Sequence, residues 1–229
     1  MSPRWSAPKD LVVPAVGDDH DRVTVPGYAR HYLFLRRGVG VIGIGLPVVL
    51  VLGNAVLFGG ALASSLSGYY FTGMRDVHVG GMCAVGVFLV TYRYARLDTV
   101  VGIVAGVSAI GLALLPTAPP DPSTTERLVG IAHLVFATVF FLALAFFCLF
   151  LFTRTNPAVP PTPRKLVRNR VYRVCGVLML VCLALIVVTQ LLLGGALAGL
   201  RPALWLESVA AIAFGVAWLV KGETVLTDE

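Results

Sequence analysis

Six long apolar runs constrain this chain more than any other feature. They cover residues 38–63, 77–95, 98–116, 128–153, 172–194 and 202–220. A helix needs about 20 apolar residues to cross the hydrocarbon core of a bilayer. In the second run, His78 and Arg93 bracket a short apolar stretch, so that helix could begin earlier, near Tyr70. The runs predict an all-α fold: a polytopic membrane protein with a six-transmembrane-helix bundle over residues 38–221.

The composition agrees with a chain that lies mostly in lipid. Of its 229 residues, 57% are hydrophobic and only 13% are charged, whereas soluble domains carry about 25% charged residues. The remaining residues are predicted to form two tails. Residues 1–37 are a polar, partly flexible tail with an aromatic and basic interfacial end, and 222–229 form a short tail after the last run.

The distribution of basic residues predicts the orientation of the bundle. The two ends and alternate connections carry Arg30, Arg36, Arg37, Arg93, Arg96, Arg154, Arg164, Lys165, Arg168, Arg170, Arg173 and Lys221. The other connections carry only Arg75, Arg127 and Arg201. Because basic connections stay in the cytoplasm, both termini and the Pro-rich, basic segment 154–170 are predicted to be cytoplasmic, in the plasma membrane. The net charge of +6 therefore reflects topology and membrane lipids as partners, not nucleic-acid binding.

Polar residues in the apolar runs gather in the predicted outer half of the bundle. Such residues are costly in a membrane and need a partner or a purpose. We expect an outward-facing ligand pocket, whose four main residues and two rim residues are Arg75, Asp76, His133 and Glu207, with Tyr70 and Gln190. The inner half of the bundle is almost purely apolar in sequence.

Four interpretations of these polar residues stay open. They could form an interfacial belt in which His133 and Glu207 satisfy each other. They could bind a lipid headgroup or another small polar ligand, which is the function we favour. They could bind a divalent metal for lipid ester or amide hydrolysis, with the ligand set Asp76, His78, His133 and Glu207. They could also relay protons in a transporter. An accessory subunit of a larger membrane complex is a further alternative, and whether the chain is an enzyme stays open.

Other motifs are few. No phosphate-binding loop, nucleophile elbow or zinc-protease pattern occurs, and no cofactor is predicted. The four cysteines lie within apolar runs and are expected to be small buried hydrophobes. The pairs Gly102…Gly106 and Gly195…Gly199 have the spacing of close helix crossings. We expect packing within one chain, although a membrane-protein partner or a homo-oligomer is also open.

Three segments carry a resemblance to a known group. They are 65-SLSGYYFTGMRDVHVGGMCAVGVFLVTYR-93, 111-GLALLPTAPP-120 and 203-ALWLESVAAIAFGVAWLVKGE-223. Together they resemble uncharacterised bacterial six-helix membrane proteins over about residues 35–223, which implies a fold but no activity. A more distant likeness is to the alkaline ceramidase and progestin-receptor-like membrane hydrolases. It rests on Ser67, Asp76, His78 and His133, while the late HxxxH pair and the seventh helix of that superfamily are missing.

Overall fold

The computed structural model describes residues 26–155, 158, 160–192, 197 and 199–222. This part is all-helical, with 81% of residues in helices and no strand. The elements in chain order are α1 (Pro26–Phe58), η1 (Ser67–Phe71), α2 (Arg75–Val90), α3 (Arg96–Leu114), α4 (Thr124–Phe146), η2 (Phe147–Leu151), α5 (Pro163–Leu192) and α6 (Pro202–Lys221). Here η1 is a 3-10 turn and η2 a π-helical continuation of α4.

Five stretches of the described chain are long and apolar enough to cross a membrane. They are Leu33–Phe58, Arg96–Leu114, Thr124–Leu151, Pro163–Gln190 and Pro202–Lys221. This pattern is that of a membrane protein. Helix α2 is shorter, at 16 residues, which corresponds to about 24 Å at 1.5 Å per residue.

Two helices begin well before their apolar runs. Helix α1 starts at Pro26 and α5 at Pro163, where proline fits because the first turn of a helix needs no N–H donor. The basic half of the segment 154–170, expected to be a loop, therefore forms the first turns of α5. Long basic side chains are good helix formers, so the helices continue past the end of the apolar sequence.

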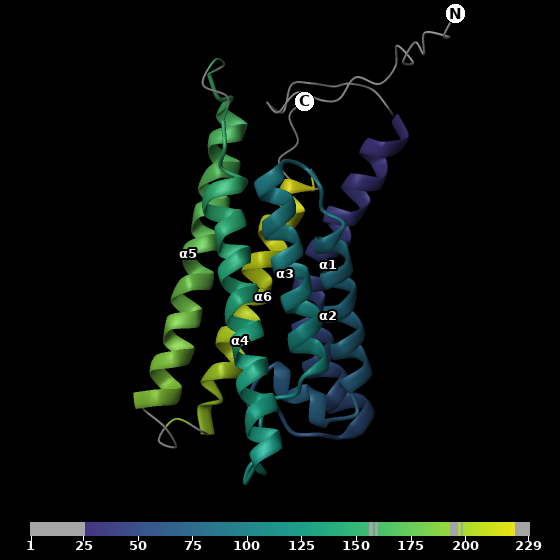
Figure 1. The fold of residues 1–229 in the computed structure, drawn as a ribbon, viewed down its shortest axis with the longest axis vertical. Helices are drawn as coiled ribbons and strands as arrows, with labels where there is room; N and C mark the ends of the chain where they lie inside the picture. Colours follow the sequence, from purple (N-terminus) through teal and green to yellow (C-terminus); the bar gives the residue numbers. More distant parts are fainter. Residues whose placement is uncertain (1–25, 156–157, 159, 193–196, 198, 223–229) are drawn as a thin grey trace, which may run out of the picture.

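The helices form a closed arrangement in which each packs on its sequence neighbours (Figure 1). Helix α2 packs on α1 and α3, α4 on α3 and α5, and α6 on both α5 and α1. The first and last helices thus lie side by side. The ends at which α1 finishes and α2, α4 and α6 begin lie together at the bottom of Figure 1. We call this the loop end of the bundle.

Glycines allow two of these helix pairs to approach closely. A Cβ atom built on Gly106 of α3 would lie 2.5 Å from the Gly86 carbonyl oxygen of α2. On the other pair, a Cβ on Gly215 of α6 would lie 2.7 Å from the Gly40 carbonyl oxygen of α1. The predicted Gly102…Gly106 pair therefore packs within the chain. Of the second predicted pair, Gly195 lies outside the described residues.

Aromatic side chains fill the end of the bundle away from the loops. Trp218 is 1% exposed and lies at the centre of this group. Its ring centroid is 4.6 Å from that of Phe152, 5.1 Å from Phe147 and 5.5 Å from Phe214. This aromatic layer packs the interior of the bundle on the side away from the loop end.

Candidate functional site

A cavity of about 70 Å³ lies inside the bundle between the aromatic layer and the loop end. Residues of α1, α2, α3, α4 and α6, together with η1, contribute to its wall. They are Ile42, Gly43, Leu46, Leu66, Ser67, His78, Met82, Val85, Leu112, Ala137, Phe140, Phe141, Glu207, Ala211 and Phe214. Only Ser67, His78 and Glu207 in this set carry polar side chains.

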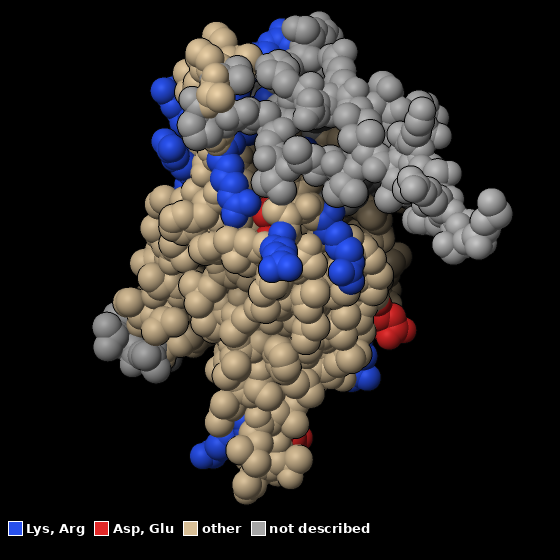
Figure 2. Space-filling view, turned by 45° about the horizontal axis from the view of Figure 1, so that its top comes forward, with Lys and Arg blue, Asp and Glu red and all other residues tan. Residues whose placement is uncertain are grey.

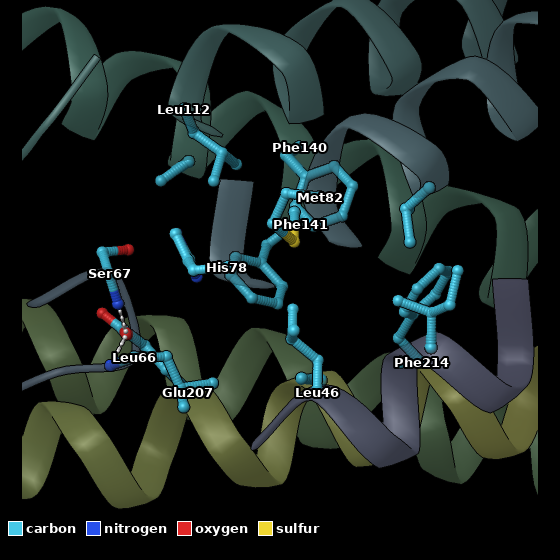
Figure 3. Close-up of a pocket in the computed structure, with 15 residues that line it drawn as sticks. Leu46, Leu66, Ser67, His78, Met82, Leu112, Phe140, Phe141, Glu207 and Phe214 are labelled. Carbon is cyan, nitrogen blue, oxygen red and sulfur yellow. Dashed lines mark hydrogen bonds between the residues drawn. The ribbon is translucent and has the colours of Figure 1, made fainter. Parts of the chain in front are cut away.

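Helical spacing explains why the cavity has one polar and one apolar end. On α6, Glu207, Ala211 and Phe214 are four and three residues apart, which places them on one face. On α2, His78 and Val85 share a face in the same way. Seven residues correspond to about 10 Å along a helix. Figure 3 shows Ser67, His78 and Glu207 at one end of the cavity and Phe214 at the other.

Glu207 holds the loop between α1 and α2 against α6. Its Oε2 atom accepts hydrogen bonds from the backbone N–H groups of Leu66, at 2.7 Å, and Ser67, at 3.3 Å. These N–H groups lie at the start of the 3-10 turn η1, where they have no acceptor within the turn. In addition, Leu204 N–H donates to the Ser64 carbonyl at 3.2 Å. Glu207 therefore has a structural role at the polar end of the cavity.

Asn54 holds the other end of the same loop. Its side chain is 3% exposed, and its Nδ2 donates to the Ala61 carbonyl at 2.9 Å. The Gly60 N–H donates to the Asn54 carbonyl at 3.0 Å. Asn54 and Glu207 thus hold the two ends of one loop over the cavity.

His78 is the unusual residue of the site. It is 3% exposed, it lines the cavity, and its Nδ1 atom has no hydrogen-bond partner among the described residues. Buried polar atoms in proteins almost always have a partner, and an exception needs an explanation. Tyr69 Oη also has none in the described part of the chain, but Tyr69 packs in a separate apolar cluster with Leu50 and Leu204 and is not part of the cavity wall.

His133 has a structural partner of its own. It is 3% exposed, and its Nδ1 lies 2.6 Å from the Leu115 carbonyl oxygen at the end of α3. Because a carbonyl can only accept, this nitrogen carries the proton and donates. The interpretation in which His133 and Glu207 satisfy each other is therefore wrong: each is bonded to backbone groups of a different segment.

The remaining residues of the predicted pocket lie elsewhere. Tyr70, Arg75 and Asp76 line a second, open pocket of about 380 Å³ at the loop end, beside Ala113. There Arg75 Nε donates to the Tyr70 carbonyl at 2.8 Å, and the guanidinium lies 4.6 Å from the Tyr70 ring centroid. Gln190 is exposed and lines neither pocket. The structure thus divides the six predicted residues instead of gathering them.

A metal centre finds no support in this geometry. The alternative ligand set required side chains from three helices, α2, α4 and α6, to converge. Within residues 26–155, 160–192 and 199–222, no three His, Cys, Asp or Glu side chains are grouped closely enough to hold an ion. Asp76 and Glu207 line different pockets.

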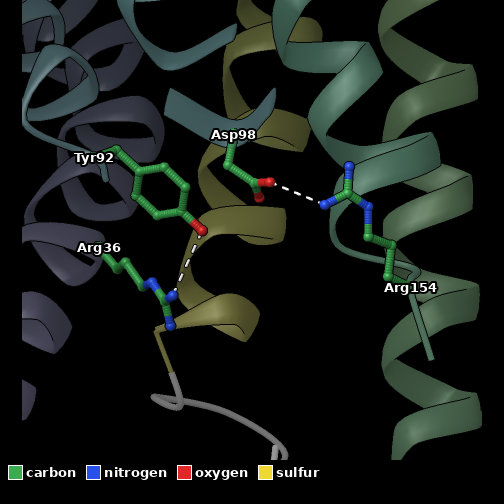
Figure 4. Close-up of polar contacts among 4 residues, drawn as sticks. All are labelled: Arg36, Tyr92, Asp98 and Arg154. Carbon is green, nitrogen blue, oxygen red and sulfur yellow. Dashed lines mark hydrogen bonds and ion pairs between the residues drawn. The ribbon is translucent and has the colours of Figure 1, made fainter. Parts of the chain in front are cut away.

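The end of the bundle that we predict to face the cytoplasm contains buried polar contacts, although the inner half of the bundle is almost purely apolar in sequence. Asp98, with its side chain 4% exposed, pairs with Arg154 at 2.9 Å. The buried Arg36 donates to Tyr92 Oη at 3.4 Å and to the Lys221 carbonyl at 3.2 Å. Figure 4 shows that the first contact joins α3 to the chain after η2, and that the contact of Arg36 with Tyr92 joins α1 to the chain after α2. Both contacts lie at the end of the bundle opposite the cavity.

Sequence reasoning identified Glu207 but missed most of the cavity. Ser67 and His78 entered only through the resemblance and the metal alternative, and the apolar wall was not predicted. One signal was available: both His78 and Glu207 begin a stripe of residues spaced i, i+4, i+7, which places a polar group in phase with apolar residues on one helix face.

Comparisons with known proteins add no functional information. No protein-family model, no curated protein and no solved structure matches the chain. The resemblances stated from the sequence stay predictions. The function must therefore be inferred from the cavity and its polar end.

Proposed function

We propose that this chain is a plasma-membrane protein of six transmembrane helices, with both termini in the cytoplasm, that binds a lipid or a small amphiphilic ligand in its outer half. The single observation that carries the binding function is the cavity. It has an apolar wall and one polar end, where a buried His78 nitrogen has no partner among the described residues.

Charge supports the orientation. Figure 2 shows most of the visible Lys and Arg side chains around one end of the molecule and few around the other. The basic end includes Arg36, Arg154 and Lys221, whereas the loop end carries Arg75, Arg127 and Arg201. By the positive-inside rule, the basic end faces the cytoplasm and the cavity opens toward the outer leaflet.

Helix α2 supplies the sixth crossing in this proposal. Its length of about 24 Å falls short of the roughly 30 Å hydrocarbon core. The loop 59–74 and the turn η1 fold over its start and are held there by Glu207 and Asn54. Non-helical backbone at membrane depth is tolerated where it is buried in protein, so this loop can complete the crossing.

Single cysteines test the topology. Pro120→Cys and Thr155→Cys lie at exposed positions on opposite ends of the bundle. In intact cells, a membrane-impermeant maleimide should label the first and not the second. Labelling of both positions from the same side would refute the orientation, and the parent protein controls for the native cysteines.

A variant that fills the cavity tests the binding function. Ala137→Phe places a ring in the wall, whereas Val135→Phe adds bulk to the same helix at a position that is 57% exposed. We expect wild type and Val135→Phe, purified from native membranes, to retain the same specific small molecule in mass spectra of extracts, and Ala137→Phe to lose it. Equal retention by all three proteins, or no specific molecule in wild type, would refute the proposal.

A further inference from the structure

The polar end of the cavity has unused hydrogen-bonding capacity on three side chains. His78 Nδ1 is buried without a partner among the described residues. Both bonds to Glu207 use Oε2, so Oε1 accepts none from the described part of the chain. Ser67 is 9% exposed, and its backbone N–H, not its hydroxyl, bonds Glu207. A ligand head at this end would therefore meet a carboxylate oxygen, an imidazole nitrogen and a hydroxyl.

The charge of the wall excludes anionic heads. Among the described residues, Glu207 is the only charged one that lines the cavity, and no Lys or Arg joins it there. The closest basic residue in this part of the sequence, Arg75, lines the separate surface pocket. A phosphate or carboxylate buried beside Glu207 would lie next to a like charge without a cation to compensate it, which is strongly unfavourable in an apolar environment.

The volume of the cavity limits the size of the head. The cavity volume of about 70 Å³ is about half of the roughly 150 Å³ of an apolar cavity that binds benzene. This is enough for a small head and the first carbons of one chain, and too little for a glycerophosphate head with two chains.

The geometry points to a single-chain amphiphile with a small head that donates a hydrogen bond to Glu207 and carries no negative charge: an alcohol or a protonated amine. The inference rests on the proposed binding function and names its ligand class. An alcohol donates to Glu207 Oε1 and accepts from Ser67 or His78. A protonated amine has three donors for the three side chains.

Four photoreactive probes with one identical alkyl chain and different heads test this inference. The heads are an alcohol, an amine, a carboxylic acid and a phosphate, and the full-length protein is reconstituted in nanodiscs. The readout is labelling of peptides from α2 and α4, with Ala137→Phe as the blocked control. We expect the alcohol or the amine to label these peptides at least about tenfold more than either anionic probe, a difference of about 1.4 kcal/mol.

Each outcome decides a different question. Equal or stronger labelling by the acid or the phosphate would overturn the ligand class and leave the binding function intact. Absence of labelling by all four probes, with Ala137→Phe indistinguishable from wild type, would remove the binding function itself.

Glu207→Gln then separates the two accepted heads. The amide oxygen can still accept from Leu66 and Ser67, but the negative charge is lost. An amine ligand should lose at least about tenfold in labelling, because the amide NH2 that replaces Oε1 can only donate. An alcohol should lose less, because its hydroxyl can turn and accept a hydrogen bond from that NH2. Asp121→Asn, at an exposed position outside the cavity, controls for the loss of one negative charge.

Discussion

Replacing each of the two buried histidines by leucine should change stability in opposite directions. In His78→Leu, a buried nitrogen without a partner among the described residues is replaced by an apolar group of similar size, so the desolvation cost of that nitrogen, about 1–3 kcal/mol, is removed. In His133→Leu, the 2.6 Å bond to the Leu115 carbonyl is lost. Hydrogen bonds between membrane helices contribute about 0.6–2 kcal/mol, and the carbonyl left behind adds to this loss.

We therefore expect His78→Leu to gain about 1 kcal/mol and His133→Leu to lose about 1–3 kcal/mol. For a chain of this length, 1 kcal/mol shifts the midpoint of thermal unfolding by about 2–4 °C. The assay is thermal unfolding in mild detergent, followed by tryptophan fluorescence, to which the buried Trp218 contributes, and by the amount of monodisperse protein after heating.

The test depends on whether His78→Leu raises or lowers the stability of the protein. A loss of stability as large as that in His133→Leu would mean that the His78 ring has a structural partner, and the assignment of His78 to a ligand would fail. If the expected gain occurs together with loss of probe labelling, stability and binding oppose each other at this position, as expected for a residue kept for function.

Two further pairs of variants test the packing and the buried ion pair. Gly106→Ala should destabilise the protein by about 1–3 kcal/mol, because its Cβ would lie 2.5 Å from a carbonyl oxygen of α2. Gly45→Ala, whose Cβ would have nothing within 4 Å, should stabilise it by about 0.5–1 kcal/mol. Shifts of the two unfolding midpoints in the same direction would contradict this. Arg154→Ala should destabilise more than Asp98→Asn, because it leaves the buried carboxylate unpaired while the half-exposed guanidinium can reach water, and the reverse order in the same assay would contradict it.

Much of the fold could be predicted because bilayer thickness acts directly on sequence. Five of the six apolar runs correspond to helices that are long and apolar enough to cross. The errors lie where hydropathy contains no information: α1 and α5 continue into basic sequence as far as Pro26 and Pro163. Helix α2 is short since the chain before it forms a loop and a 3-10 turn, whose acceptor, Glu207, lies more than a hundred residues away in the sequence.

The predicted pocket grouped residues by depth, but depth does not fix direction. Asp76 and His78 lie at nearly the same level of α2. Two residues on a helix are about 200° apart, so when His78 faces the cavity, Asp76 faces away from it. The structure accordingly places Asp76 in the wall of the open surface pocket. The helical period alone separates the two residues, because only His78 is in phase with the apolar residues Met82 and Val85.

Partners among backbone groups could not be predicted at all, because such groups leave no signature in sequence. Once these partners are known, the polar residues of the predicted outer half can be sorted by the hydrogen-bonding capacity that the fold leaves unused. His133 bonds the Leu115 carbonyl, and Asn54 bonds the loop, so both are accounted for. Glu207 uses one oxygen on the loop and keeps the other, and His78 Nδ1 bonds nothing among the described residues. A polar residue at membrane depth indicates only that a hydrogen-bond partner is needed. A ligand can supply the partner that the fold does not, and Glu207 and His78, which keep such capacity, share one end of one cavity.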